Sequence, residues 1–250
     1  MLLYDRQKRI LEIMKQYKSV TVELLCEKVF ASPATIRRDL NEMSRLGLLK
    51  KVHGGAVSND GANEDPPLVV RQQSETASKK NIAELAMKLC KEGQTLFLDS
   101  SSTVTGLARE IVKSGSYSIL SNGIETVSVL NESTNIKLYS CGGKVNNHSS
   151  IVGSIAEDTV KRFHADILFF SCSGISENSG ITEGSEETAA VKKCMINNSR
   201  VKVLLCDSSK FGQEFFCLTC DMNDIDVLIT DKKPMDSFLN NLPKHIKVYY

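Results

Sequence analysis

The stretch SPATIRRDLNEMSRLGLLKKVHGGA, residues 32–56, joins a capped helix to a basic tail that ends in small residues. Ser32 can cap a helix, and Pro33 follows at the first helical position, where its missing N–H costs no hydrogen bond. The pattern predicts a helix over residues 33–46, which Gly47 then terminates. Its apolar residues recur at the spacing of one buried helix face: Ile36, Leu40 and Met43.

Two shorter helices precede this one in the sequence, and a strand pair follows it. Residues 5–17 carry apolar side chains at helical spacing, and residues 21–29 form a second amphipathic segment that begins at a threonine. The stretch LLKKVHGGAV, residues 48–57, is typical of a short strand pair, or wing. In a three-helix unit with a tight link between helices two and three, the third helix can lie in the DNA major groove.

The net charge of +1 hides an asymmetry between the two parts of the chain. Residues 1–57 hold 11 Lys and Arg against 6 Asp and Glu, a net charge of +5. The remaining residues hold 20 against 24, a net charge of −4. A basic segment joined to an acidic one favours a polyanion as the partner of the first.

The predicted third helix carries two adjacent arginines, Arg37 and Arg38, away from its apolar face. Arginine reads guanine through two hydrogen bonds or grips phosphate, although most such charge pairs simply form a solvated face. The three-helix spacing, the wing and the charge asymmetry together favour DNA. The predicted DNA-binding residues are Ser32, Ala34, Thr35, Arg37, Arg38, Asn41, Lys50, Lys51 and His53.

Residues 58–70 open with SNDGANEDPP, which lacks apolar periodicity and is rich in turn formers, so we interpret them as a linker. Over residues 71–250, helical segments alternate with short apolar strands, which predicts a mostly parallel sheet covered on both faces. The expected fold class is α/β, with a small winged helix-turn-helix domain over residues 1–57 before the larger domain. The predicted strands read TLFLD, SYSILS, IKLYSCGG, ADILFFSCSG, RVKVLLCD and DVLITD.

The segment SPATIRRDLNEMSRLGLLKKVHGGA closely resembles the signature of the DeoR family of bacterial transcription regulators. The resemblance extends over essentially the whole chain. It implies a winged helix-turn-helix followed by a sugar-phosphate effector domain akin to ribose-5-phosphate isomerase and glucosamine-6-phosphate deaminase. Two positions depart from the family pattern: Phe30 stands where the turn between helices usually has glycine, and Cys26 stands where helix two usually has alanine.

The apolar strands of the second domain end in small polar clusters. Because the carboxyl ends of parallel strands share one edge, where ligands bind in open α/β sheets, these clusters predict a common site. Hydroxyls, glycine amides and helix N-termini suit a phosphate or polyol, whereas any single cluster is more often an ordinary capped turn. The predicted effector-binding residues are Asp99, Ser100, Ser101, Ser102, Thr103, Asn122, Gly142, Gly143, Gly174, Glu187, Lys192, Asp207 and Lys210.

The family resemblance adds three expectations about this site. The family's first loop commonly reads Asp-x-Gly-Thr-Thr, and here Ser101 replaces the glycine. A family glutamate before the late helix corresponds to Glu186 or Glu187, and the sequence does not decide between them. Lys79 matches a lysine that typically opens the first helix of the domain.

Eight cysteines, several of them inside apolar strands, are typical of reduced intracellular thiols rather than of a disulfide framework. No apolar run approaches the roughly 18 residues that cross a bilayer, and the charged N-terminus lacks signal-peptide features. We therefore expect a cytoplasmic protein. Cys217 and Cys220 have the spacing of half a zinc site or a redox pair, but no second pair accompanies them, so we expect no metal and no cofactor.

The sequence-based hypothesis is a DNA-binding transcriptional regulator, a repressor of a sugar-metabolism operon whose DNA binding responds to a phosphorylated sugar. The family implies a homo-oligomer on repeated or palindromic half-sites. Two alternatives remain open. One is a sugar-phosphate isomerase or deaminase with a DNA-binding appendix, with Asp99, Glu187 or Asp207 as its general base. The other is a thiol-based redox sensor.

Overall fold

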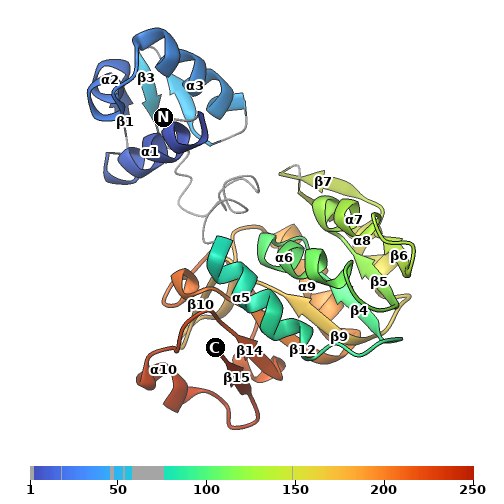
Figure 1. Cartoon of the computed structure of the whole chain (residues 1–250). Helices are drawn as coiled ribbons and strands as arrows, with labels where there is room; N and C mark the ends of the chain where they lie inside the picture. The colour runs from blue at the N-terminus through green and yellow to red at the C-terminus, as the bar shows by residue number, and fades with distance from the viewer. Residues whose placement is uncertain (1–2, 18, 46–47, 53, 58–75, 148) are drawn as a thin grey trace. The chain divides into compact units, whose positions relative to one another are not determined.

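The computed structural model describes residues 3–17, 19–45, 48–52, 54–57, 76–147 and 149–250. The chain divides into two units, Met1–Val70 and Arg71–Tyr250 (Figure 1). The predicted linker, residues 58–70, lies outside the described residues, and the domain boundaries around it stay a prediction.

The first unit combines three helices with a small antiparallel sheet. Its elements in chain order are α1 (Leu3–Gln16), β1 (Ser19–Thr21), α2 (Val22–Val29), α3 (Pro33–Arg45), β2 (Lys50–Val52) and β3 (Gly55–Val57). The strand order is β1–β3–β2, so the hairpin after α3 also pairs with the short strand before α2. The predicted winged helix-turn-helix is confirmed. One apolar core unites its parts: Ile10, Ile13, Val20, Leu25, Val29, Ile36, Leu40, Met43 and Ala56.

An ion pair in the first unit holds α3 against α1. The Asp39 carboxylate is fully buried, and Arg6 donates two hydrogen bonds to it, one of them 3.0 Å long. The hydrogen bond to Asp39 raises the pKa of Arg6. Because Asp39 and Leu40 face the core, Arg37 and Arg38, on the same turn of the helix, point away from it and are exposed.

The turn between α2 and α3 is built from two side-chain caps and one left-handed residue. Thr21 caps α2 by accepting a hydrogen bond from the Leu24 amide, and Ser32 caps α3 by accepting one from the Thr35 amide. Between the helices Phe30 adopts a φ of 55°, with its side chain 92% exposed. Glycine reaches this conformation without strain, so a phenylalanine here costs about 1–2 kcal/mol.

The second unit is built on a seven-stranded sheet in which all neighbouring strands run parallel. In spatial order its strands are β15 (Lys247–Tyr249), β14 (Val227–Ile229), β12 (Ser199–Leu205), β9 (Ala165–Phe170), β4 (Thr95–Leu98), β5 (Tyr117–Ser121) and β6 (Ile136–Ser140). The chain runs outward from β4 to β6, returns to the centre at β9, and continues outward on the other side. The predicted α/β class is confirmed.

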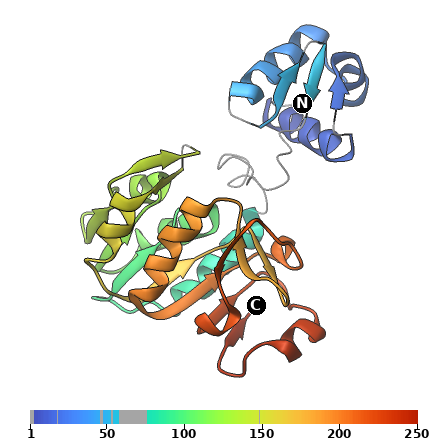
Figure 2. The same cartoon turned by 180° about the vertical axis from the view of Figure 1, so that it is seen from behind.

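Helices cover both faces of this sheet. Successive strand residues point to opposite sides, and because these residues are apolar, both faces must be covered. Leu96 and Leu98 pack in the apolar cluster that includes α5 (Thr76–Met87), α6 (Ser102–Ile111) and α7 (Ile124–Leu130). Phe97, between them, packs in the cluster that includes α8 (Ser154–Val160), α9 (Glu186–Asn197) and α10 (Asp236–Asn241). The view from behind in Figure 2 shows α9 on the face opposite α5 and α6.

Two small antiparallel elements were not expected from the sequence. One is the hairpin of β7 (Lys144–Asn146) and β8 (Ser150–Val152). The other is a three-stranded sheet of β10 (Gly174–Ser176), β11 (Gly180–Glu183) and β13 (Cys217–Cys220). Strands of three or four residues are too short to show periodicity. Short 3-10 turns at Ser208–Lys210 and Met222–Asp224 complete the fold.

Replacing Phe30 by glycine is expected to stabilise the first unit by roughly 0.5–1 kcal/mol. Glycine removes the backbone strain, and the greater conformational entropy that it gives the unfolded chain offsets only part of this stabilisation. Hydrogen exchange of the α2 and α3 amides in the full chain measures the effect. Phe30→Ala is the matched control, since alanine keeps the Cβ and should leave exchange nearly unchanged. Equal slowing of exchange in both variants would contradict the strain.

Candidate functional site

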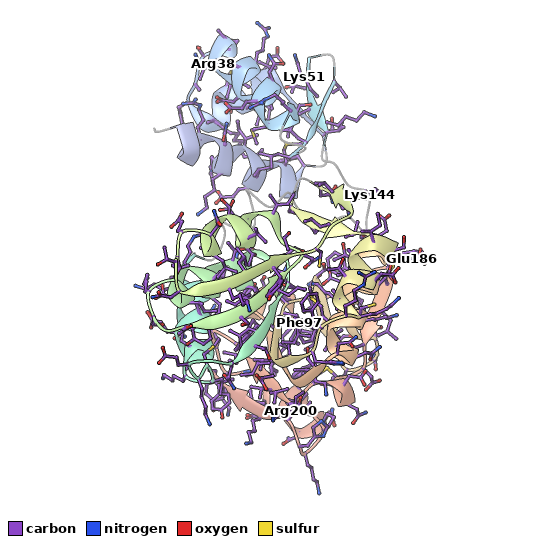
Figure 3. The ribbon with its side chains drawn as sticks, turned by 90° about the vertical axis from the view of Figure 1, so that its right-hand side faces the viewer. Arg38, Lys51, Phe97, Lys144, Glu186 and Arg200 are labelled. Carbon is purple, nitrogen blue, oxygen red and sulfur yellow. The ribbon has the colours of Figure 1, made fainter. Side chains whose placement is uncertain are left out.

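The surface of α3 presents most of the residues predicted to touch DNA. Ser32, Ala34, Arg37, Arg38 and Asn41 are exposed, and Thr35 is half-buried, with its hydroxyl 2.9 Å from that of Ser32. In Figure 3, Arg38 is labelled on α3 and Lys51 on the adjacent hairpin. The structure therefore brings the predicted residues of this helix onto one accessible surface.

The hairpin of β2 and β3 adds positive charge beside that helix. Lys50 and Lys51 are both exposed, and the Lys51 ammonium donates a 2.6 Å hydrogen bond to the Asn41 side-chain oxygen. His53, also predicted to contact DNA, lies outside the described residues. A side-chain hydrogen bond thus links the helix to the hairpin, at the surface that carries the predicted DNA-binding residues of both.

In the second unit, β4 and β9 lie side by side and parallel at the centre of the sheet, and the chain adds later strands on opposite sides of this pair. In open α/β sheets, ligands bind beyond the carboxyl ends of the strands at such a switch point. The residues that follow β4 are Asp99, Ser100, Ser101 and Ser102, all buried, and Ser171 follows β9. The largest predicted polar cluster therefore lies at the position where the topology favours a ligand.

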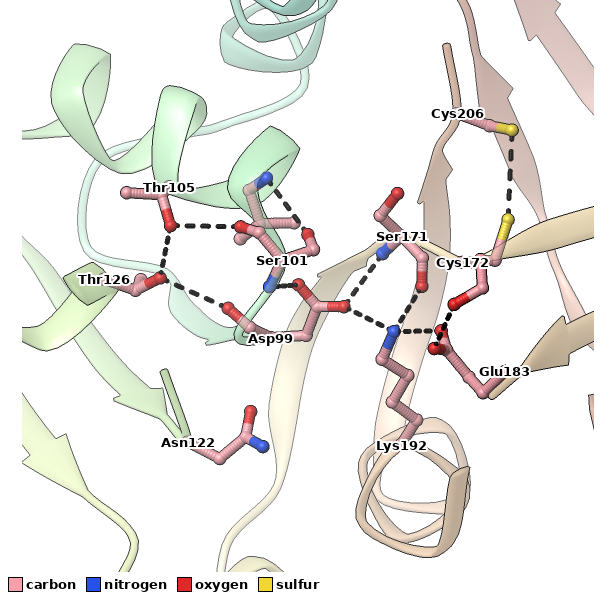
Figure 4. Close-up of polar contacts among 12 residues, drawn as sticks. Asp99, Ser101, Thr105, Asn122, Thr126, Ser171, Cys172, Glu183, Lys192 and Cys206 are labelled. Atoms are coloured by element: carbon pink, nitrogen blue, oxygen red, sulfur yellow. Dashed lines mark hydrogen bonds and ion pairs between the residues drawn. The ribbon is translucent and has the colours of Figure 1, made fainter. Parts of the chain in front are cut away.

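Asp99 connects the loops that follow the two central strands (Figure 4). One carboxylate oxygen accepts a 2.8 Å hydrogen bond from the Ser101 amide, and the other accepts a 3.0 Å hydrogen bond from the Ser171 amide. That second oxygen also lies 3.1 Å from the Lys192 ammonium. Asp99 is fully buried, so these three partners offset the cost of placing its charge in the interior.

Lys192 reaches this cluster from α9 and is only 4% exposed. Its ammonium forms ion pairs with Asp99 and Glu183 and donates a 2.6 Å hydrogen bond to the Ser171 carbonyl. Burial acts to lower the pKa of Lys192, but the two carboxylates outweigh it and raise the pKa above its usual value. The predicted effector cation is therefore charged and already engaged inside the protein.

A second layer of polar groups surrounds the loop after β4. The Thr126 hydroxyl donates to the Asp99 carbonyl at 3.3 Å and lies 2.9 Å from the Thr105 hydroxyl, which in turn donates to the Ser101 carbonyl. Asn122, at the end of β5, is 1% exposed, and its amide group donates to the Ile151 carbonyl at 3.1 Å. Among the described residues, no hydrogen-bond partner is recorded for its side-chain oxygen. A buried acceptor without a partner is costly, so a ligand hydroxyl or amide there would be stabilising.

The remaining predicted effector residues fall into two groups. Gly142, Gly143 and Lys210 are at least partly accessible beyond β6 and β12. Asp207 and Gly174 are buried for structural reasons. Asp207 caps the turn over residues 208–210, and a Cβ on Gly174 would lie 2.3 Å from the Gln213 carbonyl oxygen.

The two glutamates considered for the late helix lie away from the buried cluster. Glu186 is exposed, and Glu187 forms an accessible ion pair with Lys144 of β7 at 2.9 Å. The glutamate that meets Lys192 is Glu183, at the end of β11, and it also accepts a 2.8 Å hydrogen bond from the Ser173 hydroxyl. Sequence reasoning missed Glu183 because it did not predict β11.

Cys220, one of the two cysteines with the spacing of a zinc site or redox pair, is not suited to reaction. Cys220 is buried, and burial raises the pKa of its thiol, which makes it a poor nucleophile. Within the described part of the chain, no group of three or more His, Cys, Asp and Glu residues could hold a metal ion. The described helices include none that is long and apolar enough to cross a membrane.

Models of known protein families match both units. Residues 6–62 match the DeoR-like helix-turn-helix domain, and residues 74–232 match the DeoR C terminal sensor domain. The chain belongs to the DeoR family. It is 31% identical over 229 residues to the transcriptional repressor AccR of Agrobacterium fabrum, covering 91% of this chain and 89% of that protein. It is 29% identical over 242 residues to the glycerol-3-phosphate regulon repressor of Escherichia coli, covering 96% of each.

The family prediction made from the sequence is thereby confirmed. The chain is a DNA-binding transcriptional regulator and not an enzyme, so the isomerase or deaminase alternative is not supported. Among solved structures, the chain is similar to ribose 5-phosphate isomerase A of Methanocaldococcus jannaschii over 55% of each chain, with 19% identity and a TM-score of 0.42.

Replacing Lys192 by methionine is expected to destabilise the second unit by about 3–5 kcal/mol near pH 7, because two buried carboxylates lose their common cation. Since the Lys192 pKa is raised, its contribution is complete at neutral pH and would be lost only in strongly alkaline solution. In the variant, protonation of a carboxylate reduces the repulsion between the two buried charges. The loss of stability relative to the wild type should therefore be smaller near pH 5 than near pH 8. Urea unfolding at each pH measures the deficit.

Lys193→Met is the matched control, because the neighbouring Lys193 is exposed and should cost less than about 0.5 kcal/mol. A deficit for Lys192→Met no larger than that of the control, or one that grows as the pH falls, would contradict the proposed pairing.

Proposed function

We propose that the protein represses a sugar-metabolism operon in the cytoplasm and that a phosphorylated sugar, bound at the carboxyl edge of the parallel sheet, modulates its binding to an operator. The observation that carries this proposal is the polar cluster at the β4–β9 switch point, in a chain whose other unit presents an arginine-bearing helix. The Escherichia coli relative is named as the repressor of a glycerol-3-phosphate regulon, which is consistent with a small phosphorylated effector.

On the DNA side, α3 is the element that would enter the major groove. Within the described part of the chain, Asp39 on the same helix is paired with Arg6, and Arg37 and Arg38 are exposed, so both arginines can form bidentate contacts with guanine or bind phosphate. Ser32 and the first-turn amides of α3 suit a phosphate, and Lys50 would reach the neighbouring backbone.

On the effector side, the first turn of α6 supports phosphate binding. The first amides of a helix have no partner within the helix. Here the Val104 amide donates to the Ser101 hydroxyl at 3.2 Å. Among the described residues, no partner is recorded for the Ser102 and Thr103 amides, which could therefore face an anion. The sugar hydroxyls would then meet the Asn122 oxygen and the carboxylates around Lys192, both of which accept hydrogen bonds.

A hydrogen-bonded path connects the same edge to the start of the second unit. Asp231, after β14, accepts a 2.6 Å hydrogen bond from the Ser208 amide in the loop after β12. Burial acts to raise the Asp231 pKa, but hydrogen bonds from the Ser78 side chain and from Ser208 outweigh it and lower the pKa. Ser78 lies in α5, the first described element after the predicted linker. A movement of the loop after β12 would therefore change the hydrogen bonding at the start of α5.

The operator and the assembly follow from the same proposal. A single winged helix reads a short site, and paired half-sites one helical turn apart need two such helices presented symmetrically. We therefore propose a homo-oligomer. An effector that changes operator occupancy from mostly bound to mostly free must favour one arrangement by about 5 kcal/mol.

Arg38→Ala is expected to weaken operator binding by about 1–3 kcal/mol and to relax sequence preference at one base pair, because a side chain that reads a base edge is lost. Operator affinity of the full chain, measured at fixed salt, provides the test. Arg9→Ala is the control, since Arg9 is an exposed residue of α1 paired with Glu12. Equal effects of the two substitutions on operator affinity would show that Arg38 does not contact the operator.

Ser78→Ala is expected to reduce the effector's influence on operator affinity by about 1 kcal/mol, roughly fivefold, because the hydrogen bond to Asp231 is lost. Operator affinity without effector should be unchanged. The measurement compares operator affinity with and without the sugar phosphate that stabilises the wild-type chain most in thermal unfolding. Ser114→Ala, an exposed serine after α6, should behave like the wild type. An unchanged response in Ser78→Ala would exclude this path.

A further inference from the structure

The contact between the wing and α3 is made by two accessible side chains. Lys51 of β2 donates a 2.6 Å hydrogen bond from its ammonium to the side-chain oxygen of Asn41 on α3. Both residues are exposed, so this contact is not part of the apolar core. It is the only hydrogen bond recorded for the Asn41 side chain among the described residues.

The chemistry of lysine decides which end of the Asn41 amide faces it. An ammonium has three donors and no acceptor, so the Asn41 oxygen must face Lys51 and the Asn41 nitrogen must point elsewhere. The two N–H groups of that nitrogen therefore remain available to an acceptor outside the protein. The remaining donors of the Lys51 ammonium lie next to them.

These donors lie beside a hollow between the helix and the wing. A cavity of about 510 Å³ is lined by Val22, Arg37, Leu40, Lys51, Val52, Gly54 and Gly55. Asn41 lies four residues after Arg37, one helical turn along the same face of α3. Arg37, Asn41 and Lys51 thus border one surface, and it carries positive charge and hydrogen-bond donors.

We propose that Lys51 sets the base preference of Asn41, so that this pair reads guanine instead of the adenine that an unconstrained asparagine prefers. The proposal rests on the proposed entry of α3 into the major groove. A free asparagine recognises adenine by accepting from its amino group and donating to N7. Here the adenine amino group would compete with a cation for the same oxygen.

Guanine presents two acceptors, O6 and N7, at the position where adenine presents one donor and one acceptor. The Asn41 nitrogen and the spare donors of Lys51 can satisfy both acceptors together. Lys51 is in this account a positioning residue that also contributes a donor, and its loss should change sequence preference as well as affinity.

The test is selection of operator duplexes from a randomised library by the full-length protein and its variants at one salt concentration. Asn41→Ala identifies the base pair that Asn41 faces, as the position at which preference is relaxed. At that position the wild type is expected to prefer guanine. Lys51→Met, which keeps the side-chain stem, is expected to shift the ratio of adenine to guanine sites roughly tenfold towards adenine.

Lys50→Met is the matched control, because it removes the same charge from the preceding residue of β2, whose side chain points to the other face of the strand. It should lower affinity similarly for all sequences and leave base preference unchanged. If Lys51→Met behaves like Lys50→Met, or if Asn41→Ala relaxes no position, the inference is overturned while DNA recognition stands. If the wild-type chain enriches no sequence at all, the proposed function itself fails.

Discussion

The second unit depends on a buried charge cluster in which one ammonium holds two carboxylates. Lys192 from α9 meets Asp99 after β4 and Glu183 at the end of β11, and the Ser171 backbone after β9 closes the arrangement. Charges cannot be buried at low cost unless they are paired and hydrogen-bonded, so the loops that supply the partners are held in one arrangement. The edge at which a ligand would bind is thereby preorganised before any effector arrives.

The first unit applies the same physical rule at a smaller scale. The buried pair of Arg6 and Asp39 sets the rotation of α3 about its axis, which leaves Arg37 and Arg38 to the solvent. In both units, then, a charge that is satisfied internally decides which other polar groups stay available for a partner. A regulator needs both internally paired and available polar groups. Recognition requires unpaired donors and acceptors, whereas folding tolerates few of them in the interior.

Most of the architecture could be predicted from the sequence, because it follows from local patterns. The cap at Ser32, the helical spacing of Ile36 and Leu40, and the alternation of helices with apolar strands are all local signals. The site could be predicted only in part. The loop that begins at Asp99 follows a recognisable strand, but Glu183 ends a four-residue strand without periodicity. Whether Lys192 faces a ligand or pairs internally depends on contacts between segments far apart in the sequence, and local patterns carry no such information.

In the proposed function, a phosphorylated sugar bound at the carboxyl edge of the parallel sheet changes operator affinity. The most direct measurement is amide hydrogen exchange of the full chain with a sugar phosphate that has been shown to change its operator affinity. We expect the effector to slow exchange at residues 99–103 and around residues 208–210. Slower exchange confined to another region, such as the cavity of about 660 Å³ beside Phe216 and Leu218, would contradict it.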